Sequence, residues 1–225
     1  MNEVVIRPLR FTADVPAMRA FLETLGLRSR IESERGGWVD MVAGRGMVAL
    51  HDSAASSTGG RAGETSLAFE ADDVDELRAR LDQARSDAAG DQDATVFDEA
   101  FGRVLSMVGP ENTAIWIDER SKDLYGYKLN DAQPDQRWSV TPQLSVGDQS
   151  AWSRYLEFLG GDNAELVRFG PRAGELEVRL EFGTTESLAD VAQRLTAAGH
   201  PSRQAEGVLT VTDPDGQTVR VHAAS

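Results

Sequence analysis

A succession of strand, helix and further strands recurs four times along this chain of 225 residues. The clearest copies begin at residues 8–11 (Pro-Leu-Arg-Phe) and 142–145 (Pro-Gln-Leu-Ser). Each leads into a helix with a similar end, Phe-Leu-Glu-Thr-Leu-Gly-Leu at 21–27 and Tyr-Leu-Glu-Phe-Leu-Gly-Gly at 155–161. Weaker copies begin at 66–69 and 179–182. Because every copy of a repeat builds the same local unit, this periodicity constrains the fold more than any single motif does.

The apolar residues within one copy predict which elements it forms. Residues 4–12 read as a strand, and apolar residues of the next segment, among them Val15, Met18 and Leu22, recur at helical spacing. Two apolar segments, 38–43 and 47–51, flank Gly-Arg-Gly and predict a hairpin. We therefore expect an α+β fold made of four βαβββ repeats.

Composition restricts the classes of function. The chain contains no cysteine, so it forms no disulfide and has no thiol chemistry. Its net charge of −14 repels phosphate backbones, so we expect no nucleic-acid partner. The first residues lack the pattern of a signal peptide, and no apolar run reaches membrane-spanning length. We expect a cytoplasmic protein without a membrane partner.

The polar segment 120–137 predicts a linker between two domains. The first domain then covers residues 1–119 and the second, whose strands are shorter, covers 138–225. If the two domains pack as two chains do in a dimer, the protein is a monomer of pseudo-dimeric domains; a homodimer is the alternative.

Three segments carry a resemblance to a known family. They are the helix end at 21–27, the stretch Ala-Phe-Glu-Ala-Asp-Asp-Val-Asp at 68–75, and Asp-Pro-Asp-Gly-Gln at 213–217 before the final strand. In this order and spacing they resemble the vicinal oxygen chelate superfamily, which includes glyoxalase I, extradiol dioxygenases and bleomycin-resistance proteins. The resemblance implies two tandem domains, each with cupped mixed β-sheets around a cavity.

Enzymes of this superfamily usually hold a divalent metal in the cup through His, Gln or Glu. The matching positions are Arg7, Ser66 and Trp116 in the first domain, and Thr141, Arg179 or Leu180, and Arg220 in the second. An arginine carries no lone pair for a metal, and the tryptophan ring offers only an N–H donor. We therefore predict neither a metal nor a cofactor, and we assign no catalytic residue.

The resemblance extends to drug-sequestering members of the superfamily, which bind without a metal. It implies that this chain binds a small aromatic or cationic molecule, such as an antibiotic, in the first cup. The expected ligand-binding residues are Arg7, Trp38, Asp40, Ser66 and Trp116. Two tryptophans would stack on the ligand, Asp40 would pair with a cation, and Arg7 would pair with an anionic or carbonyl group.

Two alternatives stay open at this point. The chain could be a lyase, isomerase or dioxygenase of the glyoxalase or dioxygenase type, with unusual ligands or with Asp40, Glu70 or Asp118 as a base. It could also be a protein-interaction module whose tryptophans fill the cups. The three histidines have no metal-binding spacing, so they favour neither alternative.

Overall fold

The computed structural model describes residues 4–86, 94–99, 102–120 and 126–224. By its internal contacts the chain divides into two compact units. The first unit consists of Met1–Arg7, Leu67–Asp123 and Leu144–Glu177. The second unit consists of Pro8–Ser66, Leu124–Gln143 and Val178–Ser225. Among the described helices, none is long and apolar enough to cross a membrane.

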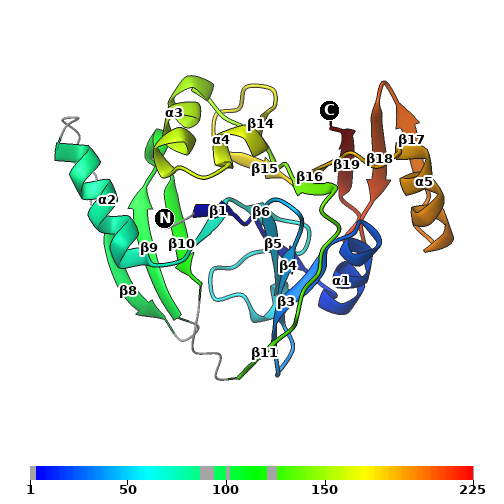
Figure 1. The fold of residues 1–225 in the computed structure, drawn as a ribbon, viewed down its shortest axis with the longest axis horizontal. Helices are drawn as coiled ribbons and strands as arrows, with labels where there is room; N and C mark the ends of the chain where they lie inside the picture. Colours follow the sequence, from blue (N-terminus) through cyan, green and yellow to red (C-terminus); the bar gives the residue numbers. More distant parts are fainter. Residues whose placement is uncertain (1–3, 87–93, 100–101, 121–125, 225) are drawn as a thin grey trace. The chain divides into compact units, whose positions relative to one another are not determined.

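The first unit is built around a five-stranded mixed sheet in the order β1-β7-β10-β9-β8 (Figure 1). Its elements are β1 (Val4–Ile6), β7 (Ala68–Ala71), α2 (Val74–Ser86), β8 (Thr95–Glu99), β9 (Gly102–Val108), η2 (Pro110–Asn112), β10 (Ala114–Glu119), α3 (Gln149–Leu159), α4 (Asn163–Leu166) and β14 (Arg168–Phe169). Strand β14 also joins β13 (Gln143–Ser145) and β15 (Glu177–Arg179) in a short sheet. The division between the units passes through β13 and β15.

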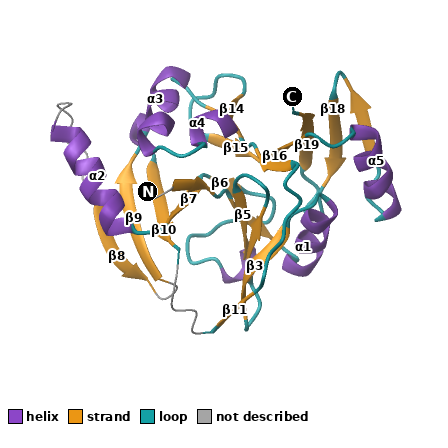
Figure 2. Ribbon diagram, viewed as in Figure 1, coloured by secondary structure: helices purple, strands orange, loops and turns teal. Residues whose placement is uncertain are grey.

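The second unit contains two sheets, each larger than the three-stranded sheet just described; Figure 2 shows their strands in orange. The six-stranded sheet has the order β11-β3-β4-β5-β2-β6, and the five-stranded sheet has the order β12-β16-β19-β18-β17. The elements are β2 (Leu9–Thr12), α1 (Val15–Thr24), β3 (Arg28–Ser33), β4 (Trp38–Val42), β5 (Met47–Asp52), η1 (Ser53–Ala55), β6 (Thr65–Ser66), β11 (Tyr127–Leu129), β12 (Trp138–Val140), β16 (Glu181–Thr184), α5 (Leu188–Ala197), β17 (Ser202–Ala205), β18 (Val208–Thr212) and β19 (Thr218–Ala223).

Helix α1 shows how local sequence sets an element. Its N-terminus is capped by Asp14, whose Oδ1 accepts a hydrogen bond from the Ala17 amide at 2.9 Å. After the helix, Gly26 adopts φ +89°, a conformation that glycine reaches without steric cost. The apolar face of the helix is fully buried, as its spacing predicts.

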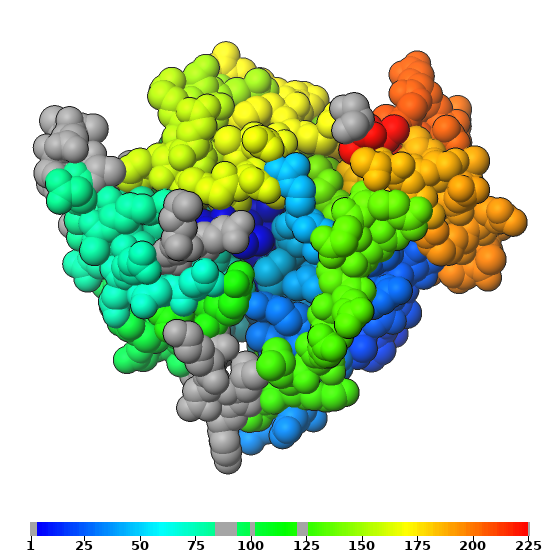
Figure 3. Space-filling view, in the orientation of Figure 1, coloured from blue at the N-terminus to red at the C-terminus, as the bar shows by residue number. Residues whose placement is uncertain are grey.

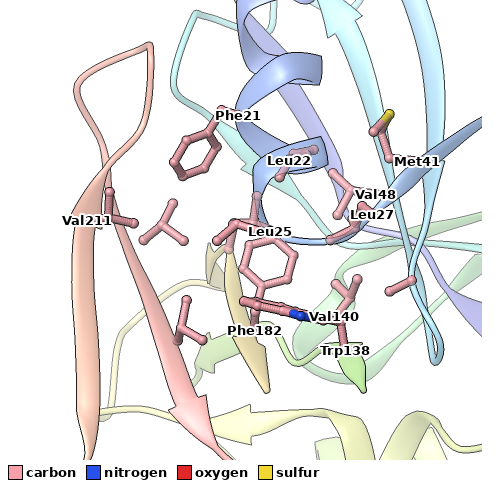
Figure 4. Packing of buried hydrophobic residues seen from close by; sticks show 14 of the residues in the cluster. Phe21, Leu22, Leu25, Leu27, Met41, Val48, Trp138, Val140, Phe182 and Val211 are labelled. Carbon is pink, nitrogen blue, oxygen red and sulfur yellow. The ribbon is translucent and has the colours of Figure 1, made fainter. Parts of the chain in front are cut away.

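One hydrophobic core joins the first and fourth repeats within the second unit (Figure 4). Phe21 of α1 and Leu25, which follows that helix directly, share it with Trp138 of β12 and Phe182 of β16, all of them almost completely buried. The space-filling view places the orange residues of the fourth repeat beside the blue residues of α1 (Figure 3). Burial of side chains this large is the main stabilising contribution to the unit.

The strand predicted over residues 4–12 is two strands, β1 and β2, which lie in different sheets and different units. Pro8 stands between them, and proline has no N–H to continue a ladder. The first strand of every repeat is divided in the same way, at Arg7-Pro8, Leu67, Thr141-Pro142 and Leu180. The chain passes from one unit to the other at or near each of these breaks.

The predicted α+β fold class is confirmed. The grouping of the four repeats into the two compact units is one that the sequence did not indicate. The second unit brings together the first and fourth repeats, and the first unit brings together the second and third. The boundaries 1–119 and 138–225 follow chain order and stay a prediction about domains. The predicted linker, 120–137, contains strand β11, which extends the six-stranded sheet by pairing with β3.

Candidate functional site

The positions that correspond to metal ligands lie next to the strand breaks or on the last strand of a repeat. In the first unit, Arg7 follows β1 directly, and Trp116 lies on β10. In the second unit, Thr141 lies between β12 and β13, and Arg220 lies on β19. That these positions form a site stays a prediction, and the chemistry of their side chains decides what such a site could hold.

The Arg7 guanidinium is buried against two carboxylates of the first unit. Its Nη2 donates to Asp118, and its Nη1 lies 4.0 Å from Glu70. Glu70 in turn accepts a hydrogen bond from Arg120 Nε at 2.7 Å. Both carboxylates that the sequence offered as acid–base candidates in this unit are thus engaged by arginines, and Arg120 Nη1 also lies 2.6 Å from Asp72.

Trp116 extends from the same sheet beside this cluster. It is 39% exposed, while its strand neighbours Ile115 and Ile117 are fully buried on the opposite face. Its indole contacts the Phe97 ring edge to face, with centroids 5.9 Å apart. Trp116 and Asp118 share a face of β10, as residues two apart on a strand do. Phe97 is a neighbour that the sequence analysis missed.

In the second unit, Trp38 and Asp40 share one face of β4, as the alternation predicts. The residues between and after them, Val39 and Met41, point into the hydrophobic core. Asp40 is buried, and its Oδ2 accepts from Arg30 Nη2 at 3.3 Å. A cation from this chain therefore already pairs with the carboxylate that was expected to pair with a ligand. Burial, and then the charge of Asp40, raises the pKa of nearby Tyr127.

The ring of His51 lies between two aromatic side chains on this same face. Its centroid is 5.5 Å from that of Trp38 and 5.7 Å from that of Phe11. His51 Nδ1 lies 2.7 Å from the carbonyl oxygen of Asp52, which can only accept, so Nδ1 carries the proton. In the neutral ring this leaves Nε2 as an acceptor. The sequence analysis did not include His51 among the ligand-binding residues, although its cross-strand partner is Trp38.

Ser66 is exposed at the end of β6, where it pairs with Leu9. Of the five predicted ligand-binding residues, Arg7 and Trp116 belong to the first unit and Trp38, Asp40 and Ser66 to the second. Trp116 lies on the five-stranded sheet of the first unit with Phe97 and Asp118, and Arg7 directly follows a strand of that sheet. Trp38 and Asp40 lie on the six-stranded sheet of the second unit with His51. Whether all five form one site stays a prediction.

A further carboxylate occupies the last repeat. Glu181 is buried on β16, accepts from His222 Nε2 at 2.7 Å, and lies 3.4 Å from Arg220 Nη1. Arg220 and His222 therefore share one face of β19, as residues two apart on a strand do. Glu181 was not a predicted site residue; its alternation with the buried apolar residues Leu180 and Phe182 is the signal that could have identified it.

These residues do not fit the divalent metal that the fold family implies. Arginine guanidinium groups, held by carboxylates, take the places of ligands at Arg7 and Arg220. Across the ranges that the structure describes, no three side chains of His, Asp or Glu are grouped so that they could hold a metal ion. We therefore derive no chemistry through a metal.

Comparison of the structure with solved ones identifies its fold. The 2,3-dioxygenase LapB from Pseudomonas sp. KL28 superposes with a TM-score of 0.60 at 12% identity, covering 100% of this chain and 92% of that one. Homoprotocatechuate 2,3-dioxygenase from Arthrobacter globiformis gives 0.59 at 14% identity, with 100% and 80% covered. The chain has the fold of these dioxygenases. No family model and no curated protein matches the sequence.

The resemblance to the vicinal oxygen chelate superfamily is thus confirmed at the level of the fold. A catechol 2,3-dioxygenase superposes equally well, with a TM-score of 0.60 at 11% identity, covering 100% of this chain and 89% of that one. At such low identity the likeness concerns the backbone, and one fold hosts many chemistries. Function has to be argued from the side chains.

Proposed function

We propose that this protein binds a small, flat aromatic molecule, preferably a cation, without a metal. The observation that carries the proposal is the Arg7–Asp118 pair beside the exposed Trp116. Where a metal-dependent relative needs a ligand with a lone pair, this chain has a buried guanidinium that is already neutralised. The sheet surface next to it is aromatic.

The aromatic surface is formed by Trp116 with Phe97, and Val108 of the adjacent strand is 37% exposed on the same face. Such a surface suits a planar ligand, and the indole face attracts cations with about 0.5 to 2 kcal/mol. The net charge of −14 further raises the local concentration of cations. Trp38 and His51 offer a second aromatic surface on the six-stranded sheet.

The proposal is tested by calorimetric titration with proflavine, a flat aromatic cation. We expect saturable binding that survives a chelator, and Trp116→Ala should weaken it about 5- to 30-fold, the effect of about 1 to 2 kcal/mol. Leu129→Ala is the matched control, because Leu129 is 60% exposed and belongs to the second unit. Equal affinity in the Trp116 and Leu129 variants would contradict the proposed stacking surface.

The dioxygenase-type alternative is supported by the likeness in fold. It requires an iron site, which the donor set of the described residues does not offer. Oxygen uptake with catechol after loading with Fe(II) distinguishes the two functions. We expect no uptake above that of free iron, and a protein-dependent rate would favour the enzyme.

A further inference from the structure

A cavity of about 350 Å³ lies within the second unit, apart from the two aromatic surfaces, and Glu181 and Arg220 described above are part of its lining. Its lining comes from the first and fourth repeats and consists of Arg10, Gly63, Thr65, Val178, Arg179, Leu180, Glu181, Gln217, Thr218, Val219 and Arg220. The volume is at the lower end of the range for small-molecule sites. Three of the lining residues are arginines, in a protein whose net charge is −14.

We propose that this cavity binds a small organic oxyanion, with a carboxylate or a phosphate as its headgroup. The inference is independent of the proposed function, because it concerns other residues and the opposite ligand charge. It rests on a difference between the three arginines: Arg10 is fixed by several contacts, whereas Arg179 and Arg220 have few or weak ones.

Arg10 forms the fixed wall of the cavity. Its Nη2 donates to the buried Asp213, and its Nη1 donates to the Gly63 carbonyl and, at 3.1 Å, to Thr65 Oγ1. Asp213 holds its own turn in place, since its Oδ1 accepts from the amides of Asp215 and Gln217. Because Thr65 Oγ1 accepts from Arg10, its own proton remains to be donated to a ligand.

Arg179 supplies the positive charge that no described carboxylate offsets, and Arg220 adds a second guanidinium group. Arg179 is exposed and forms no ion pair with a described residue. Arg220 Nη1 lies 3.4 Å from Glu181, which is long for a charged hydrogen bond. His222 Nε2 engages the same carboxylate at the shorter distance of 2.7 Å. A planar guanidinium matches the two oxygens of a carboxylate or phosphate. These two arginines can therefore turn toward an anion at little cost to the existing contacts.

The acidity of the whole protein does not oppose this site strongly. At physiological salt, charges separated by more than about 8 Å are largely screened. The lining itself holds three arginines and one carboxylate, Glu181, and Asp213 and Asp215 pair with Arg10, so Arg179 is the lining arginine whose charge an anion would meet. Leu180 and Val219, which are buried, add an apolar part to the lining and suit an organic body rather than a bare inorganic ion.

The test is calorimetric titration of the full chain with benzoate and with phenyl phosphate, and with benzamidine as a cation of similar shape. We expect one anion to bind saturably and benzamidine not to compete. Arg179→Ala should weaken binding about tenfold, which corresponds to about 1.4 kcal/mol. Arg220→Gln, checked for unchanged thermal unfolding, should do the same.

Arg203→Ala is the matched control, because Arg203 is an exposed arginine of the same unit outside the lining. It should bind the anion as the unaltered protein does. Trp116→Ala should also leave anion binding unchanged, which separates this test from that of the proposed function. Absence of saturable binding by both anions, or an equal loss in the Arg203 variant, would overturn the proposal.

Discussion

At the level of single residues, the chain buries two arginine side chains. Arg7 and Arg10 are each almost fully buried, and each is compensated by a carboxylate distant in sequence. Burial lowers the pKa of Arg10 and raises that of Asp213, so the charged form of each group is costly and depends on the other.

Removal of Asp213 should therefore destabilise the second unit strongly. The variant Asp213→Ala leaves the Arg10 charge buried and releases the turn at 213–217, and we expect a loss of about 3 to 5 kcal/mol in the free energy of unfolding. Asp131→Ala, at an exposed aspartate, should stay within about 0.5 kcal/mol. Urea denaturation measures both, and similar values would show that the pair is unimportant.

A second residue-scale prediction concerns pH. The hydrogen bond from Arg194, and then that from Trp138, lower the pKa of Glu186 below the value of 4.5 of a free side chain. A carboxyl with a lowered pKa stabilises the fold above the unfolded pKa, and this stability is lost as the pH falls through the folded pKa.

Glu186→Gln should consequently be less stable than the unaltered protein at about pH 7, and the difference should shrink below about pH 4.5. Urea denaturation across this range measures the difference at each pH. A difference that stays constant down to about pH 3 would mean that the charge of Glu186 does not contribute.

At the level of helices and strands, the local pattern of apolar residues predicts the helices and most of the strands. It does not predict where the first strand of each repeat is divided in two. Helix α1 was predicted from apolar spacing and a cap, both of which lie within a few residues. The division of residues 4–12 into β1 and β2 depends on which sheet each half joins, and that is decided by partners distant in sequence. Apolar alternation alone cannot distinguish one strand from two.

The turn after α1 gives an element-scale prediction. A Cβ at Gly26 would lie 2.9 Å from Trp138 Cδ1, whereas one at Gly36, which also has a positive φ, would meet nothing within 4 Å. Both alanine variants should lose about 1 kcal/mol through the backbone, and Gly26→Ala should lose about 1 to 3 kcal/mol more by overpacking. Denaturant unfolding that gave equal losses would contradict the close packing of α1 on Trp138.

At the scale of the whole molecule, the repeat predicted the fold class but not how the repeats combine. Four similar units along the chain are compatible with several pairings, and chain order favoured the first with the second. The structure pairs the first with the fourth through the core around Phe21 and Phe182 and through the contact of Arg10 with Asp213. Neither contact has a signal in local sequence, because each joins residues more than 150 positions apart.

The sequence predicted those features of the candidate site that depend on local pattern, and not those that depend on contacts between distant residues. Strand alternation placed Trp38 with Asp40 and Trp116 with Asp118 on their faces. It did not show that Arg30 and Arg7 engage these carboxylates, since those ion pairs depend on side-chain reach across strands. Residue type at the metal positions was the more informative signal, and it is the basis of the proposed binding function without a metal.

Whether the protein binds a metal is measured by elemental analysis of the untagged protein, before and after exposure to Fe(II), Mn(II), Ni(II) and Zn(II). Guanidinium groups occupy positions at which a metal would need ligands with lone pairs. We therefore expect far less than one metal ion per chain under every condition. One tightly held ion per chain would contradict it and would give the dioxygenase-type function precedence.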